Sequence, residues 1–492
     1  MIDTKTLSAP SSVAALRQPA GLKVIFFTEM WERFSYYGMR ALLVLYLVNS
    51  LGYARNDALT LYGIYTGLVY LTPLVGGYLA DRYLGMRRAA VIGAVVMTLG
   101  HFAMAFEPLL HVAMGLLIVG NGFFKPNTSA MVGELYETDD PRRSGGYTIF
   151  YMGVNLGAFM SPLVAGTLGE RLGWHWGFGS AGIGMLIGLF VLLSGQRLLG
   201  RAGLKAGQDP VSMKDLPKIL IWTASCIAFI YAAMAGWKIF SALVADWPLL
   251  LKLAVGALIA GLALWLPGLL SGRKAEPLSY AERGRVAGIG IVVFFVIFFW
   301  MGFEQAGGTL NLFADTQTDR HAFGFEIPAS WFQSINPLVI VLLAPVFSII
   351  WTRLDQSRFA ISDTAKQAFG MIVLGLGFVV MAAAQSRAEL TGTVGPQWLV
   401  IVYVLHTIGE LMLSPVGLAM VSRMAPARLA GLLMGVWLFS SAVANYLAGA
   451  LEGLLAGSGM PLFGFLIASS IGAGLVLLLL TPRIERLMSR SS

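Results

Sequence analysis

Long apolar runs alternate with short polar segments along the whole chain. Each run holds about twenty residues, the length at which a helix crosses a bilayer, whereas the strands of an outer-membrane barrel alternate over about ten. The pattern therefore predicts an all-α polytopic membrane protein. We expect fourteen transmembrane spans, at residues 22–50, 58–80, 86–106, 109–133, 145–169, 176–199, 217–239, 247–270, 285–311, 329–353, 366–386, 397–422, 429–455 and 461–481.

The composition agrees with a chain embedded in lipid. Of the 492 residues, 57% are hydrophobic and only 12% are charged, whereas a soluble domain carries about 25% charged residues. The single cysteine, Cys226, excludes an intramolecular disulfide and is expected to serve as a small packing residue. Residues 1–21 lack the apolar core of a signal peptide and are expected to form an N-terminal tail.

The basic residues indicate how the chain is oriented. Most of the 34 Lys and Arg residues fall in the loops on the side of the N-terminus, and the opposite side holds only Arg55, Arg171, Lys238, Lys252, Arg320 and Arg387. The positive-inside rule then predicts that both termini are cytoplasmic. We expect the chain to lie in the cell inner (plasma) membrane as a multi-pass protein. The net charge of +8 is therefore an orientation signal, and we expect no nucleic-acid partner.

The spans group as six, two and six. We expect an N-terminal six-helix bundle at 22–199, a linker with an accessory helix hairpin at 200–284, a C-terminal six-helix bundle at 285–481 and a cytoplasmic tail at 482–492. Two such halves favour alternating access, with a site near the membrane midplane between them.

The loop between the second and third spans carries a recognisable motif. It reads GGYLADRYLGMRR and resembles the loop motif of the major facilitator superfamily. The resemblance implies that fold, with Asp81 and Arg82 capping and clamping helix ends at the cytoplasmic face. The motif is informative about the fold and gives no information about the substrate.

The first span carries the densest polar stripe, EMWERFSYYGMR. At 100° per residue, its polar side chains fall within an arc of about 140°. Each charge at such depth is unfavourable by about 2.5–3.5 kcal/mol, so these groups must face one another or a wet space. The Glu29–Arg33 pair could neutralise itself, but Arg40 needs a partner on another helix or a ligand. The stripe consists of Glu29, Glu32, Arg33, Tyr36, Tyr37 and Arg40.

Several other spans contain polar groups at depth. Lys125 lies in the middle of its span, beside Pro126. Glu304 has no base in its own span, so its partner lies across the bundle or it is protonated, and either makes it a candidate proton carrier. It is followed by Gly307 and Gly308, which predict a bend. The remaining candidates are Tyr70, Asn155, Trp300, Asn336, Glu410, Trp437 and Ser441. His406, one turn before Glu410, is expected to be the hydrogen-bond partner of that acid.

The sequence motifs around these polar residues resemble those of the proton-dependent oligopeptide transporter family. EMWERFSYYG matches the ExxERFxYYG motif of that family at every fixed position. FYMGVNLG matches its second signature, with Val154 where isoleucine is common, and GNGFFKPN and GELMLSPVGL also fit. The resemblance implies import of di- and tripeptides driven by protons. Some members have a histidine on the second span, but residues 58–80 of this chain contain none.

The resemblance also implies a role for each candidate. Glu29, Glu32 and Arg33 would belong to proton coupling, with Glu304 exchanging between a proton and Arg40. Arg40 and Lys125 would face the peptide carboxylate and Glu410 the ammonium, with Asn155 and Asn336 on the peptide backbone. The side-chain pockets would be formed by Tyr36, Tyr37, Tyr70, Trp300, Trp437 and Ser441.

The residues by themselves agree with a peptide cargo. A site for many peptides must recognise what they share, namely an ammonium, a carboxylate and amides. The first half supplies Arg33, Arg40 and Lys125, and the second supplies Glu304 and Glu410. We also hypothesise that Lys125 and Glu410 pair across the halves when no peptide is bound.

Other functions remain open at this point. The same fold could carry nitrate, a drug or another small anion, although an anion carrier needs neither Glu304 nor Glu410. No HExxH motif, paired metal ligands or P-loop is present, so we expect neither an enzyme nor a metal site, and protons are the only coupling ion that we expect. Nothing in the sequence requires a second subunit, and we expect a monomer.

Overall fold

The computed structural model is almost entirely helical. It describes residues 17–243 and 278–489, except 138, 206 and 323. The first group of helices comprises α1 (Gly21–Asn49), α2 (Arg55–Leu79), α3 (Met86–Ala103), α4 (Leu110–Glu134), α5 (Arg143–Ser161), α6 (Thr167–Leu172), α7 (Trp174–Ser194) and α8 (Leu216–Leu243). The second comprises α10 (Tyr280–Phe303), α11 (Thr309–Thr316), α12 (Ile335–Asp355), α13 (Asp363–Thr391), α14 (Gln397–Met424), α15 (Ala430–Leu455) and α16 (Leu462–Met488).

Each predicted span within the described residues coincides with a helical segment, and the predicted span 247–270 lies outside them. Eleven of the described helical segments are long and apolar enough to cross a membrane. α1 and α3 are not among them, although α1 has 29 residues, because charged residues lie within both. The prediction of an all-α polytopic membrane protein is confirmed.

Three helices differ from the predicted spans. The span 285–311 divides into α10, a 3₁₀ turn at Glu304–Gly307 and α11, which confirms the bend predicted at Gly307 and Gly308. The span 145–169 divides into α5, a π-helical turn at Pro162–Gly166 and α6, because Pro162 has no N–H to continue the α-helical ladder. α16 continues to Met488, past the expected end at 481, so much of the expected tail is helical.

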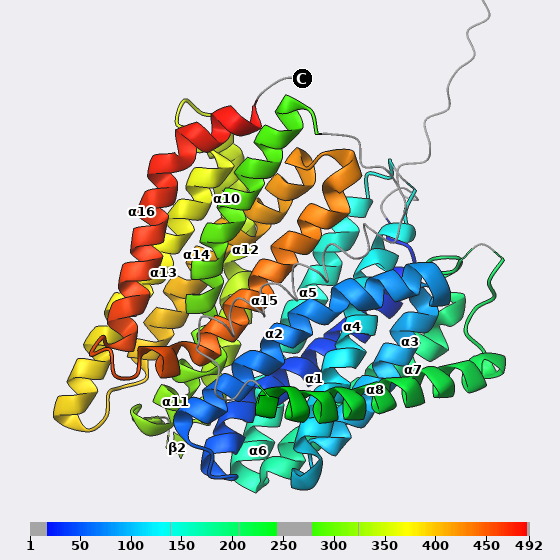
Figure 1. Cartoon of the computed structure of the whole chain (residues 1–492), viewed down its shortest axis with the longest axis horizontal. Coiled ribbons are helices and arrows are strands. Elements are labelled where there is room, and N and C mark those ends of the chain that lie inside the picture. The colour runs from blue at the N-terminus through cyan, green and yellow to red at the C-terminus, as the bar shows by residue number, and fades with distance from the viewer. Residues whose placement is uncertain (1–16, 138, 206, 244–277, 323, 490–492) are drawn as a thin grey trace, which may run out of the picture.

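The helices gather into two bundles, α1–α7 and α10–α16, which lie beside each other in Figure 1. α8 runs along the outside of the first bundle, against α3 and α4. It packs closely there, since a Cβ on Gly115 would lie 2.5 Å from Ile230. The accessory role expected for the span 217–239 stays a prediction, and the second helix of the expected hairpin lies outside the described residues.

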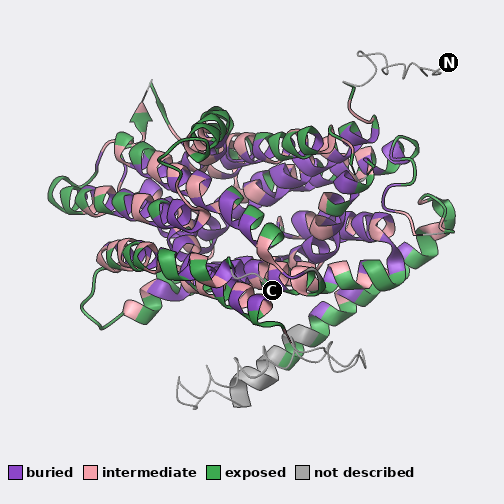
Figure 2. Ribbon diagram, turned by 90° about the horizontal axis from the view of Figure 1, so that it is seen from above, coloured by how far each residue is buried: buried purple, intermediate pink, exposed green. Residues whose placement is uncertain are grey.

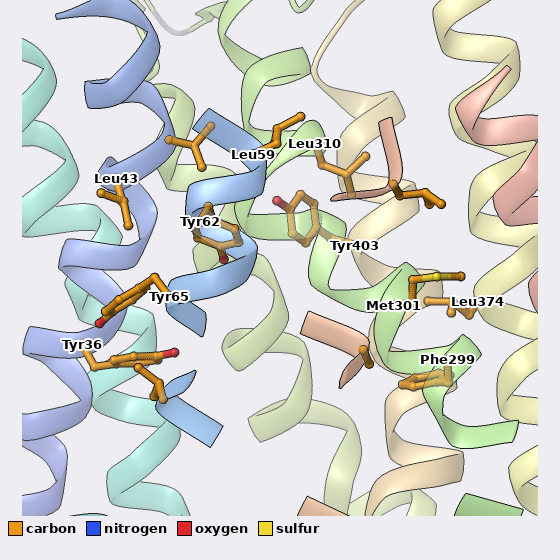
Figure 3. Close-up of a cluster of buried hydrophobic side chains, with 14 of the residues drawn as sticks. Tyr36, Leu43, Leu59, Tyr62, Tyr65, Phe299, Met301, Leu310, Leu374 and Tyr403 are labelled. Atoms are coloured by element: carbon orange, nitrogen blue, oxygen red, sulfur yellow. The ribbon is translucent and has the colours of Figure 1, made fainter. Parts of the chain in front are cut away.

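Buried residues lie along the middle of both bundles, and exposed residues lie on the outward faces (Figure 2). One apolar core continues from one bundle into the other. Figure 3 shows Tyr62 and Tyr65 of α2 beside Tyr36 of α1, with Leu310 and Tyr403 of the second bundle nearby. Apolar contacts among these residues therefore help to hold the two bundles together.

Small residues set how closely α1 and α5 approach. A Cβ on Gly157 would lie 2.1 Å from the carbonyl oxygen of Met30, which is a backbone atom and cannot move aside. We therefore expect Gly157→Ala to lower the free energy of unfolding by about 1–3 kcal/mol, as overpacking does. The thermal midpoint of the purified protein, followed by tryptophan fluorescence, measures the change. Gly179→Ala on α7 is the matched control, because its Cβ would meet nothing within 4 Å; equal midpoints for the two variants would contradict the prediction.

Polar contacts join the two bundles at one end of the molecule. In the described part of the chain, each hydrogen bond and ion pair between the bundles runs from residues 40–55 or 159–171 to residues 304–334 or Glu452. Asn49, at the end of α1, donates to Asp315 over 2.8 Å. A short antiparallel pair of strands, β1 (His321–Ala322) and β2 (Phe325–Glu326), lies at this end (Figure 1). The structure is thus closed at the end where α1 finishes.

One part of this closure is a carboxylate that accepts three hydrogen bonds from the other bundle. Glu170 of α6 accepts the backbone N–H of Ala329 over 2.7 Å, the N–H of Ser330 over 3.0 Å and the hydroxyl of Ser330 over 2.5 Å. These donors stand at the start of the 3₁₀ helix Ala329–Ser334, whose free N–H groups favour an anion. We call Glu170, Ala329 and Ser330 the outer latch.

Removing the latch carboxylate is expected to open this end. Hydrogen bonds to a charged group contribute about 1.5–3 kcal/mol, so Glu170→Ala should shift the population toward the open end roughly ten- to hundredfold. Spin labels at Leu172→Cys and Leu390→Cys in a Cys226→Ser background would report a longer distance. Both leucines are well exposed, at 64% and 87%. Glu107→Ala removes an exposed acid elsewhere and should leave the distance unchanged; an equally unchanged distance in Glu170→Ala would show that the latch does not hold this end closed.

Candidate functional site

The charged stripe of α1 lies inside the first bundle. Glu29 and Glu32 are fully buried, and Arg33 is 7% exposed. Arg33 donates to both carboxylate oxygens of Glu32, each over 2.5 Å, and its Nε lies 3.6 Å from the nearer oxygen of Glu29. The Glu29–Arg33 pairing expected from the sequence is present, but the direct hydrogen bonds go to the adjacent Glu32.

Lys125 of α4 completes this cluster. Its ammonium donates to Glu29, which also accepts the hydroxyl of Thr128 over 3.0 Å. The hypothesis that Lys125 pairs with Glu410 across the halves is wrong for this structure, because the carboxylate of Glu29 on neighbouring α1 takes that place. Two acids and two bases balance one another here. The Lys125 side chain is 30% exposed, so the cluster has one accessible charge.

Arg40 finds its partner across the bundles. The guanidinium donates to the carboxylate of Glu304, and its Nε donates to the hydroxyl of Tyr62 over 2.5 Å. Both charged groups are nearly buried, with side chains 7% and 3% exposed. The structure thus supplies the partners that the sequence left open. Arg40 has no acid within one turn on its own helix and Glu304 has no base within one turn of its own position, and the two pair with each other.

The bend after Glu304 makes room for this pair. A Cβ on Gly307 would lie 1.8 Å from the Tyr62 hydroxyl oxygen and 3.1 Å from Nε of Arg40. Only a glycine permits so close an approach of the 3₁₀ turn to the two side chains. Asn311, on the segment that follows the turn, donates to the carbonyl of Ala41 over 2.8 Å, so α1 is also held at the residue after Arg40.

Glu410 of α14 stands in the second bundle and is partly exposed. Asn336 of α12 donates to it over 2.8 Å and to Thr407 over 3.0 Å. His406 is not its partner, contrary to the expectation, because the imidazole packs on Phe378 of α13 instead, with ring centroids 4.7 Å apart. Glu410 is therefore a partly exposed residue whose carboxylate, within the described residues, accepts its hydrogen bond from an amide.

The aromatic residues of α1 and α2 surround the two guanidinium groups. Those of Arg33 and Arg40 each lie 5.7 Å from the ring of Tyr37, which is partly exposed. Tyr36 is buried beside Arg33, at 4.9 Å, and its hydroxyl has no hydrogen-bond partner among the described residues. Tyr70 is partly exposed, further along α2. The phenols thus line the space between the two charged groups of α1.

The remaining candidates occupy both bundles. Asn155 is 5% exposed and donates to the carbonyl of Tyr151 over 2.9 Å, one turn before it on α5. Trp300 is partly exposed, and its indole N–H has no partner in the described part of the chain. Trp437 and Ser441 of α15 are 3% and 7% exposed. In this conformation Trp437 and Ser441 have little contact with solvent.

The loop residues Asp81 and Arg82 are exposed, on a π-helical turn at Ala80–Leu84. The clamping role expected of these two residues stays a prediction. Arg87, a few residues later, makes contacts of this kind. Its buried guanidinium donates to the carbonyls of Ala202 and Gly200, both over 2.8 Å. Arg87 belongs to the same loop motif, and its side chain ties the start of α3 to the segment that follows α7.

Several contributors were not singled out from the sequence. Tyr62 looked like one of three tyrosines on its span, and nothing marked it as the neighbour of Arg40. Thr128 follows Lys125 by one turn, and its hydroxyl donates to Glu29. Thr407 precedes Glu410 by one turn and accepts the amide that also binds this acid. Spacing of about one turn from a charged group was the only available signal for the two threonines.

Comparisons with known proteins agree on one family. The model of the POT family matches residues 87–460. A peptide transporter of Yersinia enterocolitica is 36% identical over 98% of both chains, and the dipeptide and tripeptide permease A of Escherichia coli is 31% identical over 90% of this chain and 86% of its own. The crystal structure of a POT family transporter in complex with 5-aminolevulinic acid has a TM-score of 0.80 and 32% identity, over 96% of this chain and 100% of that one. The chain therefore belongs to the POT family of membrane transporters.

Proposed function

We propose that this protein imports di- and tripeptides together with protons, by alternating access between its two bundles. The observation that carries the proposal is the division of charge. Cations at Arg40 and Lys125 belong to the first bundle, whereas the partly exposed acid Glu410 belongs to the second. A short zwitterion lying across the bundles would meet a cation at one end and an acid at the other. Relatives named as peptide transporters support the same cargo.

Each candidate has a place in this proposal. The peptide carboxylate would bind Lys125 and Arg40, the ammonium would bind Glu410, and Asn155 and Asn336 would hold the backbone amides. The side chains of the peptide would contact a further set of residues, some buried and some partly exposed in this structure: Tyr36, Tyr37, Tyr70, Trp300, Trp437 and Ser441. We also propose that one copy suffices and that both termini face the cytoplasm, which makes the closed end extracellular.

Proton coupling would act through two clusters. Protonation of Glu304 would remove the counter-charge of Arg40 and loosen a contact between the bundles. A peptide carboxylate at Lys125 would compete with Glu29 for the ammonium. Glu29 or its neighbour Glu32 could then take up a proton, while Arg33 stays charged and pairs with the acid that remains ionised. The four groups of this second cluster interact closely, so their protons belong to the set. Each step changes which charges are paired, and therefore shifts the equilibrium between the open and closed states.

The cargo is tested by removing the proposed ammonium ligand. A hydrogen bond to a charged group contributes about 1.5–3 kcal/mol, so Glu410→Ala should raise the KM for labelled dialanine roughly ten- to hundredfold. Initial rates into liposomes under an inward proton gradient measure it. Glu389→Ala, which removes an exposed acid of the same bundle, is the control. If the wild type does not transport dialanine and accumulates nitrate or another anion instead, the fold assignment is unaffected but the proposed cargo is wrong.

A further inference from the structure

A cavity of about 500 Å³ opens at the closed end of the molecule, away from the residues proposed to bind peptide. It lies among α11, the end of α15 and the start of α16, and the beginning of α2 closes one side. Arg55 of α2 and Glu452 of α15 form a two-point ion pair in its wall, with distances of 2.7 and 2.8 Å. The hydroxyl of Thr309 donates to the same carboxylate over 2.8 Å.

This ion pair differs from the buried pair of Arg40 and Glu304. The side chains of Arg55 and Glu452 are 44% and 15% exposed, so a ligand in the cavity can reach both charges. An exposed pair stabilises a protein only weakly, because water screens it. Replacing each partner by a ligand group of the same charge would therefore cost the protein little.

The rest of the wall matches the other parts of a short peptide. Three side-chain amides, from Asn56, Gln317 and Gln385, offer donors and acceptors for peptide N–H and carbonyl groups. Phe313 and Leu455 supply an apolar surface for side chains. The volume falls in the usual range for small-ligand pockets, about 300–1,000 Å³. One cation, one anion, amides and an apolar wall are together the features that a zwitterionic peptide requires.

We propose that this cavity is a first, outer binding site for zwitterionic di- and tripeptides, in which Arg55 binds the carboxylate and Glu452 the ammonium. The assignment rests on the proposed function, since it takes the same cargo. The cavity then collects peptide at the extracellular end before the central site becomes accessible from that side.

Binding there would also loosen the closed end. The charged ends of an extended dipeptide lie roughly 5–7 Å apart, because each residue spans about 3.3–3.6 Å. A peptide between Arg55 and Glu452 cannot fit while these groups stay 2.7 Å apart. It must separate the start of α2 from the end of α15. A ligand that binds better to the separated state shifts the population toward that state.

The test uses protection of a cysteine in the cavity wall. Asn56→Cys is placed in a Cys226→Ser protein, reconstituted in liposomes, and treated with a membrane-impermeant maleimide. Dialanine should slow the labelling, and uncharged N-acetyl-dialanine amide should not. The added change Arg55→Gln should raise the dialanine concentration for half protection by about tenfold or more. Leu390→Cys, an exposed position outside the cavity wall, is the labelling control.

Two further measurements separate the outer site from the central one. Protection of Asn56→Cys should persist when Glu410→Ala weakens central binding, and its loss in that background would assign the effect to the central site and overturn the proposal. The absence of protection in a protein that still accumulates dialanine would also overturn it. A wild type that accumulates no dialanine would instead contradict the proposed function, whatever the labelling shows.

Discussion

Glu304→Gln is expected to lower gradient-driven accumulation of dialanine by at least about a hundredfold. The substitution keeps the shape of the side chain but leaves the nearly buried guanidinium of Arg40 without its counter-charge. Removing one partner of a buried ion pair is unfavourable by about 3–5 kcal/mol, and every 1.4 kcal/mol is about a tenfold change in an equilibrium. Glutamine also cannot accept a proton, so the exchange between a proton and Arg40 is lost.

Accumulation in liposomes with an inward proton gradient measures this effect. The exchange of labelled for unlabelled dialanine without a gradient should fall less, because it requires no net proton movement. Glu389→Gln, which changes an exposed acid on α13, should behave as the wild type. Full accumulation by Glu304→Gln would show that the ion pair with Arg40 is structural and that protons are coupled elsewhere.

Lys125→Ala is expected to reduce gradient-driven uptake by between about ten- and a hundredfold. The change removes the proposed ligand of the peptide carboxylate and, at the same time, the closest cation of Glu29, which is fully buried. Glu29 would keep only the hydroxyl of Thr128 and the more distant Arg33. Hydrogen bonds to charged groups, about 1.5–3 kcal/mol each, set the size of the expected loss.

Initial uptake rates at several external pH values measure this loss of uptake, and size-exclusion profiles show whether the variant is folded. Lys205→Ala is a suitable control, because that lysine contacts a loop carbonyl outside the bundles. Lys125→Arg should recover part of the activity, since it restores a cation near Glu29. Normal pH-driven uptake by Lys125→Ala would contradict its proposed role in both peptide binding and proton coupling.

The membrane explains why the helices were predictable. A span must be long and apolar, so its position can be found from composition alone. The same constraint pointed to α1, because Glu29, Glu32, Arg33 and Arg40 have to be shielded from lipid. The structure buries all four. The helix breaks were harder to place: the glycines after Glu304 signalled one, whereas Pro162 belongs to a run that remained apolar throughout.

The pairing of charges could not be obtained in the same way. The sequence showed that neither Arg40 nor Glu304 has a partner nearby on its own span, and only the family resemblance connected the two residues. It gave no information about which helices are neighbours, and so it suggested Glu410 as the partner of Lys125, although α4 presents this lysine to Glu29 on α1. The family motif predicted which residues take part in the site, but it did not predict which contacts they make in this conformation.

The closed end could not be seen in the sequence for a related reason. Glu170 follows the predicted end of a span and looks like an ordinary loop acid. Its role depends on the start of the 3₁₀ helix Ala329–Ser334, which belongs to the other bundle and is distant in the chain. Arg55 and Glu452 are likewise separated by most of the protein. Such contacts depend on how the bundles dock, which local patterns do not encode.

Proton–peptide symport is tested most directly by the proton itself. Wild-type protein is reconstituted in liposomes that contain a pH-sensitive dye, and dialanine is added outside without any imposed pH gradient, with the membrane potential clamped negative inside. We expect dialanine to acidify the lumen, capped dialanine to have no effect, and Glu304→Gln to abolish the signal. Dialanine entry with no acidification in the wild type would contradict proton coupling and leave a peptide carrier driven by the peptide gradient alone.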